Sequence, residues 1–129
     1  MPLTDTNEPE VIAELEALYA RYETALVSND ADTLTEMFWA SPHAMRFGAT
    51  ENLYGISQIA AFRKGRSPVN LARKILRQSI VTFGRDFGSI TLEFERAVDG
   101  KLVFGRQSQV WVRLPEGWKI VAAHVSMLP

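Results

Sequence analysis

The sequence predicts an α+β fold in which three helices of the N-terminal half pack on a curved antiparallel sheet. Two patterns support this prediction. Before about residue 68, apolar residues recur at intervals of three and four, as on helices, whereas from Asn70 onward they alternate with a period of two, as on strands. Helices that come first and a strand meander that comes last are typical of α+β proteins. The length of 129 residues fits one domain, 1–129.

Three segments carry helical signals. Residues 9–28 form the longest, because polar residues occupy the positions outside a continuous apolar stripe. The sequence Ser28-Asn29-Asp30 ends this helix and caps a second one at about 31–39. A third helix is expected from Gly55 to about Gly65. The apolar stripe of the first helix consists of Ile12, Leu15, Tyr19, Tyr22 and Leu26.

Strand signals occur in two groups. A short pair is expected at 43–48 and 51–54, between the second and third helices. Turn residues then separate longer strands: Gly84-Arg85-Asp86, Asp99-Gly100 and Pro115-Glu116-Gly117 mark the joints of an antiparallel meander. The four long strands are expected at about 70–84, 87–98, 102–114 and 118–128.

Composition narrows the chemistry. The chain has no cysteine, which excludes disulfides, thiolate catalysis and cysteine metal ligands. Neither His43 nor His124 has a metal-ligand partner at a useful spacing, so we expect no metal and no cofactor. No apolar run is long enough to cross a membrane, and the segment after Met1 lacks the features of a secretory signal. The expected location is the cytoplasm.

Charge is unevenly distributed along the chain. Residues 1–51 hold ten acidic residues and two basic ones, whereas 52–85 hold seven basic residues and no acidic one. This segment could be a solvated positive face, or some of its arginines could hold a small anionic substrate. Aromatic residues that would stack with bases do not interleave with the basic residues, so nucleic acid is not an expected partner.

Several stretches carry a family resemblance. The order of elements, with 104–113, 118–128 and 39–54 in particular, resembles the nuclear-transport-factor-2-like (SnoaL-like) superfamily. Within it, the chain is similar to small proteins of oxalurate catabolism and of cyanuric acid operons. This resemblance implies a cone-shaped fold with a pocket open at one end. It also implies a cofactor-free reaction that removes a carboxylate from 1,3-dicarboxyurea to give allophanate.

Two residues are the predicted catalytic pair. Tyr22 lies on the apolar stripe of the long helix, which spans the pocket in the family, so its hydroxyl could contact substrate; alternatively it is a packed core tyrosine. Arg46 stands in the apolar context Ala44-Met45-Arg46-Phe47-Gly48. Its guanidinium group could form two parallel hydrogen bonds with a substrate carboxylate. Alternatively, Arg46 lies at the edge of the sheet with its guanidinium group in water.

The predicted substrate-binding residues come from the strands and their surroundings. His124 and Ser126 share one strand face and suggest a sheet that lines a partly polar cavity, as hydrogen-bond donors or a proton shuttle. Arg73 and Gln107 could also reach this cavity. The expected apolar wall consists of Phe38, Trp39, Tyr54 and Phe62, with ordinary core packing as the alternative for Trp39.

The resemblance and the residues together predict a small enzyme that acts on an anionic ureide. The alternative is a non-catalytic partner of an amidase from the same pathway. An isomerase or cyclase would need an inward Asp or Glu beside Tyr22, and we expect none. Strands that are apolar on both faces predict a homo-oligomer, with a dimer formed sheet to sheet. No membrane partner is expected.

Overall fold

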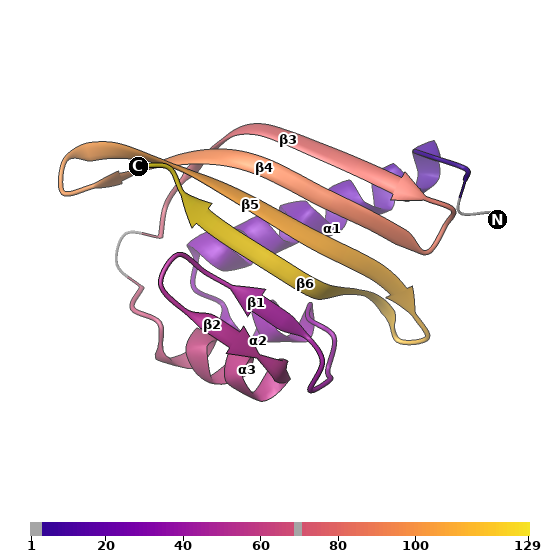
Figure 1. Ribbon diagram of the computed structural model, residues 1–129, viewed down its shortest axis with the longest axis horizontal. Coiled ribbons are helices and arrows are strands. Elements are labelled where there is room, and N and C mark those ends of the chain that lie inside the picture. Colours follow the sequence, from indigo (N-terminus) through magenta and orange to yellow (C-terminus); the bar gives the residue numbers. More distant parts are fainter. Residues whose placement is uncertain (1–3, 69–70) are drawn as a thin grey trace.

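The computed structural model describes residues 4–68 and 71–129, which form three helices and a six-stranded sheet (Figure 1). The expected fold class is confirmed, and every expected helix and strand is present within a few residues of its predicted position. The expected start of the third strand at residue 70 lies outside the described residues. The elements are α1 Pro9–Val27, α2 Ala31–Glu36, β1 Met45–Phe47, β2 Asn52–Tyr54, α3 Gly55–Gly65, β3 Lys74–Phe83, β4 Phe87–Val98, β5 Lys101–Leu114 and β6 Gly117–Met127.

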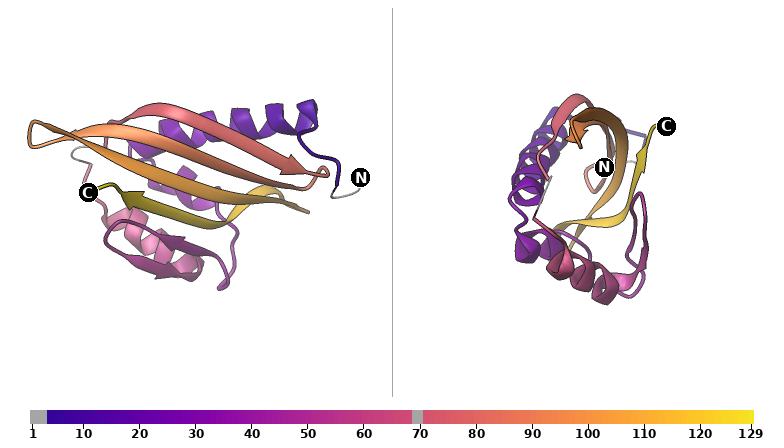
Figure 2. Two further views of the ribbon diagram at one scale, coloured as in Figure 1. Left: turned by 45° about the horizontal axis from the view of Figure 1, so that its top comes forward. Right: turned by 90° about the vertical axis from the view of Figure 1, so that its left-hand side faces the viewer.

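Helix α1 lies along the concave face of the sheet and buries one stripe against it (Figures 1 and 2). The helix ends where Ser28 and the left-handed Asn29 turn the chain, and Asp30 caps α2 by accepting a hydrogen bond from the Thr33 backbone N–H. The buried stripe of α1 is Val11, Leu15, Tyr19, Tyr22, Ala25 and Leu26, so Val11 takes the place expected for the half-buried Ile12.

The sheet has the strand order β2-β1-β6-β5-β4-β3. Strands β3 to β6 form the expected antiparallel meander, and β1 pairs with β2 as an antiparallel hairpin. The pairing of β1 with β6 is parallel, a detail of the mainly antiparallel sheet that the sequence did not indicate. This pairing joins the β1–β2 hairpin to the last strand of the meander.

The sheet curls around the helices, as the end-on view in Figure 2 shows. The bend is accompanied by an irregular register between Val110 and Trp111 on β5 and a second one on β3 between Ile75 and Arg77. The fully buried ring of Trp111 and the side chains of Ile90 and Ile120 fill the space between the sheet and α1. Helices α2 and α3 close the lower part of this core, next to the β1–β2 hairpin.

Within the described residues, we find no helix that is long and apolar enough to cross a membrane.

Close packing of β4 on β5 leads to a first prediction. A Cβ atom at Gly105 would collide with the ring of Phe94, and that ring is held by Arg73, whose guanidinium lies 4.3 Å from the ring centre. We expect Gly105→Ala to lower the free energy of unfolding by about 1–3 kcal/mol, the usual cost of overpacking. Urea unfolding followed by circular dichroism measures this change.

Gly65→Ala is the matched control, because a Cβ atom there meets nothing within 4 Å. We expect its unfolding free energy to stay close to that of the unmodified protein. Equal stability of the two variants would contradict the packing described for Phe94.

Candidate functional site

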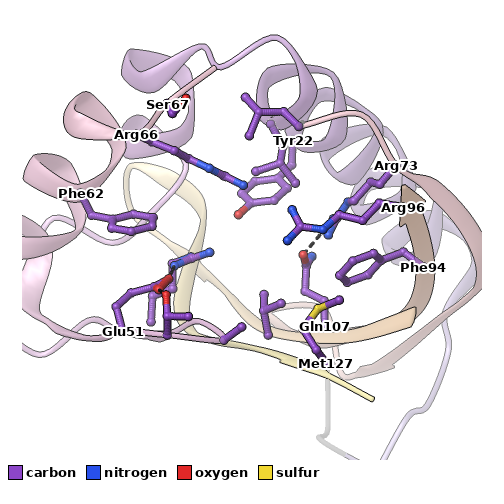
Figure 3. Close-up of a pocket in the computed structure, with 16 residues that line it drawn as sticks. Tyr22, Glu51, Phe62, Arg66, Ser67, Arg73, Phe94, Arg96, Gln107 and Met127 are labelled. Atoms are coloured by element: carbon purple, nitrogen blue, oxygen red, sulfur yellow. Dashed lines mark hydrogen bonds and ion pairs between the residues drawn. The ribbon is translucent and has the colours of Figure 1, made fainter. Parts of the chain in front are cut away.

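A cavity of about 320 Å³ opens between the C-terminal half of α1, the β1–β2 hairpin, the end of α3 and the curved sheet (Figure 3). It lies where β4, β5 and β6 bend away from the helices. Its wall combines apolar side chains with an unusual number of arginines. The polar and aromatic lining residues include Tyr22, Arg46, Glu51, Phe62, Arg66, Arg73, Phe94, Arg96 and Gln107.

The Tyr22 hydroxyl group is fixed by a buried arginine. Tyr22 is 2% exposed, and its oxygen accepts a hydrogen bond of 2.7 Å from Nη2 of Arg63, which is 0% exposed. Nε and Nη1 of Arg63 are buried and have no hydrogen-bond partner within the described residues. Because the phenol oxygen accepts from Arg63, its own proton remains available to a ligand in the cavity.

Electrostatics favour ionisation of this phenol. Burial alone would raise the pKa of Tyr22, but the positive charges of Arg63, Arg46, Arg73 and Arg66 outweigh it and bring the pKa below its ordinary value. Burial, together with the charge of Arg46, lowers the pKa of Arg63, and this outweighs the opposite effects of Tyr22 and Glu51. Tyr22 is therefore a stronger acid than a tyrosine in water.

Arg46 reaches the cavity from the short strand β1. It is 6% exposed, and its Nη1 donates to Glu51 Oε1 across the hairpin at 3.0 Å, while its guanidinium lies 5.1 Å from the centre of the Phe62 ring. Gly48 makes this pairing possible, since a Cβ atom there would occupy the position of the Glu51 carboxylate. The Thr50 hydroxyl donates to the second oxygen of Glu51.

The Glu51 carboxylate was not expected, because the sequence suggested no acidic residue in the cavity. Burial raises its pKa, but hydrogen bonds from Thr50 and Arg46, with the charge of Arg46, bring the pKa below the usual value. Glu51 is therefore ionised near neutral pH. It does not resemble the protonated acid that ketosteroid isomerases use as a hydrogen-bond donor.

A second ion pair supports the opposite wall of the cavity. Arg73 donates to both oxygens of Glu23 at 2.8 Å and also to Gln107 Oε1 at 2.9 Å. The Tyr19 hydroxyl accepts from Arg73 and Gln107 and donates to Glu23. Burial disfavours the charge of Arg73, but the bonds to Glu23 outweigh it, so the pKa of Arg73 is raised. This network is internally satisfied and holds Gln107 in place.

Two further arginines border the cavity without a carboxylate. Within residues 4–68 and 71–129, no acidic side chain lies within 4 Å of the guanidinium of Arg66 or Arg96, and each has a buried N–H group without a partner. Burial, with the nearby charges of Arg63, Arg46 and Arg96, lowers the pKa of Arg66 to about 10. Arg66 therefore stays charged at neutral pH, and its guanidinium adds to the positive charge of the cavity.

In the described part of the chain, no three His, Asp or Glu side chains lie close enough together to bind a metal ion. The polar groups that face the cavity are mainly arginines and a phenol, with the Glu51 carboxylate paired to Arg46 and the Gln107 amide held by Arg73. They can bind an anion and donate a proton to it.

The family model that matches this chain is described as AtzH-like and covers residues 4–129. The chain belongs to the AtzH-like family.

Solved structures agree with this assignment. A protein with unknown function from Pectobacterium atrosepticum is 46% identical, with a TM-score of 0.92 over 97% of this chain and 96% of that one. A cystatin-like fold protein from Burkholderia xenovorans is 41% identical, with a TM-score of 0.88 over 97% and 98%. A nuclear transport factor 2-like protein from Salmonella enterica shares the fold at 23% identity, with a TM-score of 0.76 over 93% and 92%. No curated protein sequence matches significantly.

Four of the predicted site residues of this AtzH-like chain meet at the cavity. Tyr22, Arg46, Arg73 and Gln107 all line it, and they come from α1, β1, the segment before β3, and β5. Phe62 of the expected apolar wall lines it as well. The substrate contacts of these residues stay a prediction.

His124 and Ser126 lie on the opposite face of the sheet, which corrects their expected placement. They share a face with each other, as predicted, but Val125 and Met127 are the residues of β6 that line the cavity. The outward pair borders a separate hollow together with Arg106 and Ser108 of β5. The alternation of side chains along a strand shows which residues share a face. It does not show whether that face points toward the helices or away from them. The predicted sheet-to-sheet dimer would use this outer face, and it stays a prediction.

Trp39 and Tyr54 also lie away from the cavity. The Trp39 backbone N–H donates to Ile120, five residues before Val125, so roughly 17 Å of strand separates that site from the cavity wall. Tyr54 is 54% exposed, because its neighbour Leu53 takes the inward position on β2, and its ring packs edge-on against Phe47. Phe38 is buried in the core rather than at the cavity.

The sequence analysis missed Glu51, Arg63, Arg66 and Arg96. A signal was present for Arg63, which stands one helical turn after the buried Ile59 on the apolar side of α3. Glu51 follows the hairpin turn, two residues before Leu53, the strand partner of Arg46, so antiparallel pairing of 45–47 with 52–54 would have placed it near Arg46. No local pattern identifies Arg66 or Arg96, because the curvature of the whole sheet brings them to the cavity.

The contact between Arg63 and Tyr22 predicts how the two tyrosines of α1 titrate. In an alkaline titration followed by ultraviolet absorbance of the phenolate, we expect Tyr22 to ionise first, and Tyr19, whose pKa burial raises, to ionise at higher pH. Tyr22→Phe removes the first step. Arg63→Gln moves that step to higher pH, because loss of the positive charge disfavours the phenolate.

Arg77→Gln, at an exposed position on β3, is the matched control and should leave the titration unchanged. If the first ionisation survives in Tyr22→Phe, the assignment of the acidic phenol to Tyr22 is wrong.

Proposed function

We propose that this AtzH-like chain is a cofactor-free decarboxylase that removes one carboxylate from an N-carboxylated urea, in the manner of 1,3-dicarboxyurea going to allophanate. The observation that carries the proposal is a phenol with a lowered pKa, held by a buried arginine at the wall of a cationic cavity. The family and the fold are consistent with a small enzyme of nitrogen catabolism. The ureide as substrate rests on the resemblance described above.

Arg46 is the proposed anchor for a substrate carboxylate. Glu51 uses Nη1 of its guanidinium, which leaves further N–H groups for a ligand. Charge-assisted hydrogen bonds from a guanidinium to a carboxylate contribute about 1.5–3 kcal/mol each, more than neutral ones. Glu51 also holds the guanidinium in one orientation before the ligand arrives, so less conformational entropy is lost on binding.

The reaction needs a proton at nitrogen. When the C–N bond of the carbamate breaks, the carboxyl carbon leaves as CO₂ and the bonding electron pair stays on nitrogen. Tyr22 donates its proton to that nitrogen, so that an N–H bond forms as the C–N bond breaks. The phenolate that remains is stabilised by Arg63 and regains a proton from solvent. A well-placed proton donor contributes about 10²–10⁴-fold to such a reaction.

Arg63 tunes this donor without contacting the substrate in our proposal. A phenol with its ordinary pKa of about 10 is a weak acid at neutral pH, and a nearby guanidinium makes the proton transfer less unfavourable. Gln107, held by Arg73, presents an amide to the same cavity and can orient the urea carbonyl or N–H groups.

The proposal predicts that Tyr22→Phe lowers kcat for CO₂ release by about 10²-fold or more, because the proton donor is lost. Substrate binding should change much less, since the arginines remain. The initial rate of CO₂ release from 1,3-dicarboxyurea, measured above the spontaneous rate, tests this. Tyr54→Phe is the matched control, because Tyr54 lies outside the cavity, and its rate should be unchanged.

Equal rates in Tyr22→Phe and the unmodified protein would remove Tyr22 from the mechanism. If the unmodified protein releases no CO₂ from N-carboxylated ureas but co-purifies with an amidase, the alternative of a non-catalytic partner replaces the decarboxylase.

A further inference from the structure

The cavity carries more positive charge than its own carboxylates balance. Glu51 pairs with Arg46 and Glu23 with Arg73, whereas Arg66 and Arg96 have no acidic partner in the described ranges. We propose that Arg66 and Arg96 form a second anion subsite, which makes the cavity selective for dianions over monoanions. The identity of the dianion as a ureide rests on the proposed function, whereas the preference for two negative charges does not depend on it.

The unpaired N–H groups are the first argument. Buried polar groups in proteins are nearly always hydrogen-bonded, and an unpaired buried cation destabilises the fold. Arg66 and Arg96 are each only partly exposed, and among the described residues the buried Nη1 of Arg66 and Nε of Arg96 have no hydrogen-bond partner. Groups of this kind at the wall of a cavity point to an acceptor that the ligand supplies.

Their positions are the second argument. In Figure 3, Arg66 extends from the segment after α3 toward Tyr22, and Arg96 enters from β4 above Gln107. Burial and the charges of Arg63, Arg46 and Arg96 lower the pKa of Arg66, so its guanidinium lies within electrostatic reach of both Arg46 and Arg96 at the cavity. Two like charges in one volume repel each other, and a carboxylate bound there would relieve this repulsion.

Arg46 provides the other end of the site. Its partner Glu51 borders the cavity on the side opposite Arg96, and Tyr22 lies between them in Figure 3. A dicarboxylate can therefore place one carboxylate at Arg46 and the other at Arg66 and Arg96. The atoms between the two carboxylates then lie next to the Tyr22 hydroxyl.

Charge selectivity would also explain why the proposed reaction stops after one step. Loss of CO₂ and uptake of one proton convert a dianion of N,N′-dicarboxylated urea into a monoanion. The monoanion leaves one subsite empty and restores an unpaired cation, so it binds more weakly and leaves. A second decarboxylation of the same molecule is then disfavoured by binding rather than by chemistry.

Malonate and its monoamide malonamate are matched probes, because they have similar length and differ by one negative charge. By isothermal titration calorimetry at pH 7.5, we expect the unmodified protein to bind malonate about tenfold more tightly than malonamate or better. Arg66→Gln and Arg96→Gln should each lose most of this preference, while their affinity for malonamate changes little. Arg77→Gln, which removes an exposed arginine on β3, should keep the preference.

Thermal unfolding supplies an independent measurement. If the two arginines serve a ligand rather than the fold, the melting temperatures of Arg66→Gln and Arg96→Gln without ligand should equal or exceed that of the unmodified protein. Clear destabilisation of both variants would assign them a structural role and overturn the proposal. Equal affinity of the unmodified protein for malonate and malonamate would overturn it as well.

These results separate the subsite from the reaction. Preference for malonate without CO₂ release from any N-carboxylated urea would support the dianion subsite and refute the decarboxylase. CO₂ release without any preference between the probes would support the decarboxylase and refute the subsite.

Discussion

A guanidinium buried against a phenol is the interaction on which the site depends. Arg63 is fully buried, and within the described chain its hydrogen-bond partner is the oxygen of Tyr22. A buried cation is costly unless an acceptor or negative charge lies nearby, so the fold that places Arg63 there also favours negative charge on Tyr22. This contact links the stability of α3 on α1 to the acidity of a group at the cavity wall.

The ion pairs around this contact divide the arginines by role. Arg46 and Arg73 have carboxylate partners that fix their orientation, which preorganises the cavity at its two sides. Arg66 and Arg96 have no carboxylate partner in the part of the chain that the structure describes, so their charges remain available to an anionic ligand. A cavity built in this way favours anions over cations. It also fits the chemistry proposed for Tyr22. When the substrate loses CO₂ and gains a proton, its negative charge decreases, and the product is attracted to the cavity less strongly.

The sequence predicted the architecture well. Helical and strand periodicities are visible over a few neighbouring residues, and Gly, Asp and Pro residues mark the turns of the meander. It predicted Tyr22 and Arg46 at the cavity because Tyr22 lies on the buried stripe of the long helix and Arg46 in a short apolar strand, two elements that line the pocket in the family that the chain resembles. It placed His124 and Ser126 on the wrong face, because the pairing of β6 with β5 and β1 decides the face and no local signal reports it. It missed Arg63 because a charged residue on a helix is usually assigned to the solvent side.

A crystal structure of the protein with malonate at saturating concentration tests the central claim most directly. We predict one carboxylate at Arg46, the other at Arg66 and Arg96, and the Tyr22 hydroxyl within hydrogen-bond distance of the ligand, still accepting from Arg63. Malonate bound on the outer face of the sheet beside His124, with the cavity free of it, would contradict this account. So would a Tyr22 ring turned away from Arg63 and the ligand.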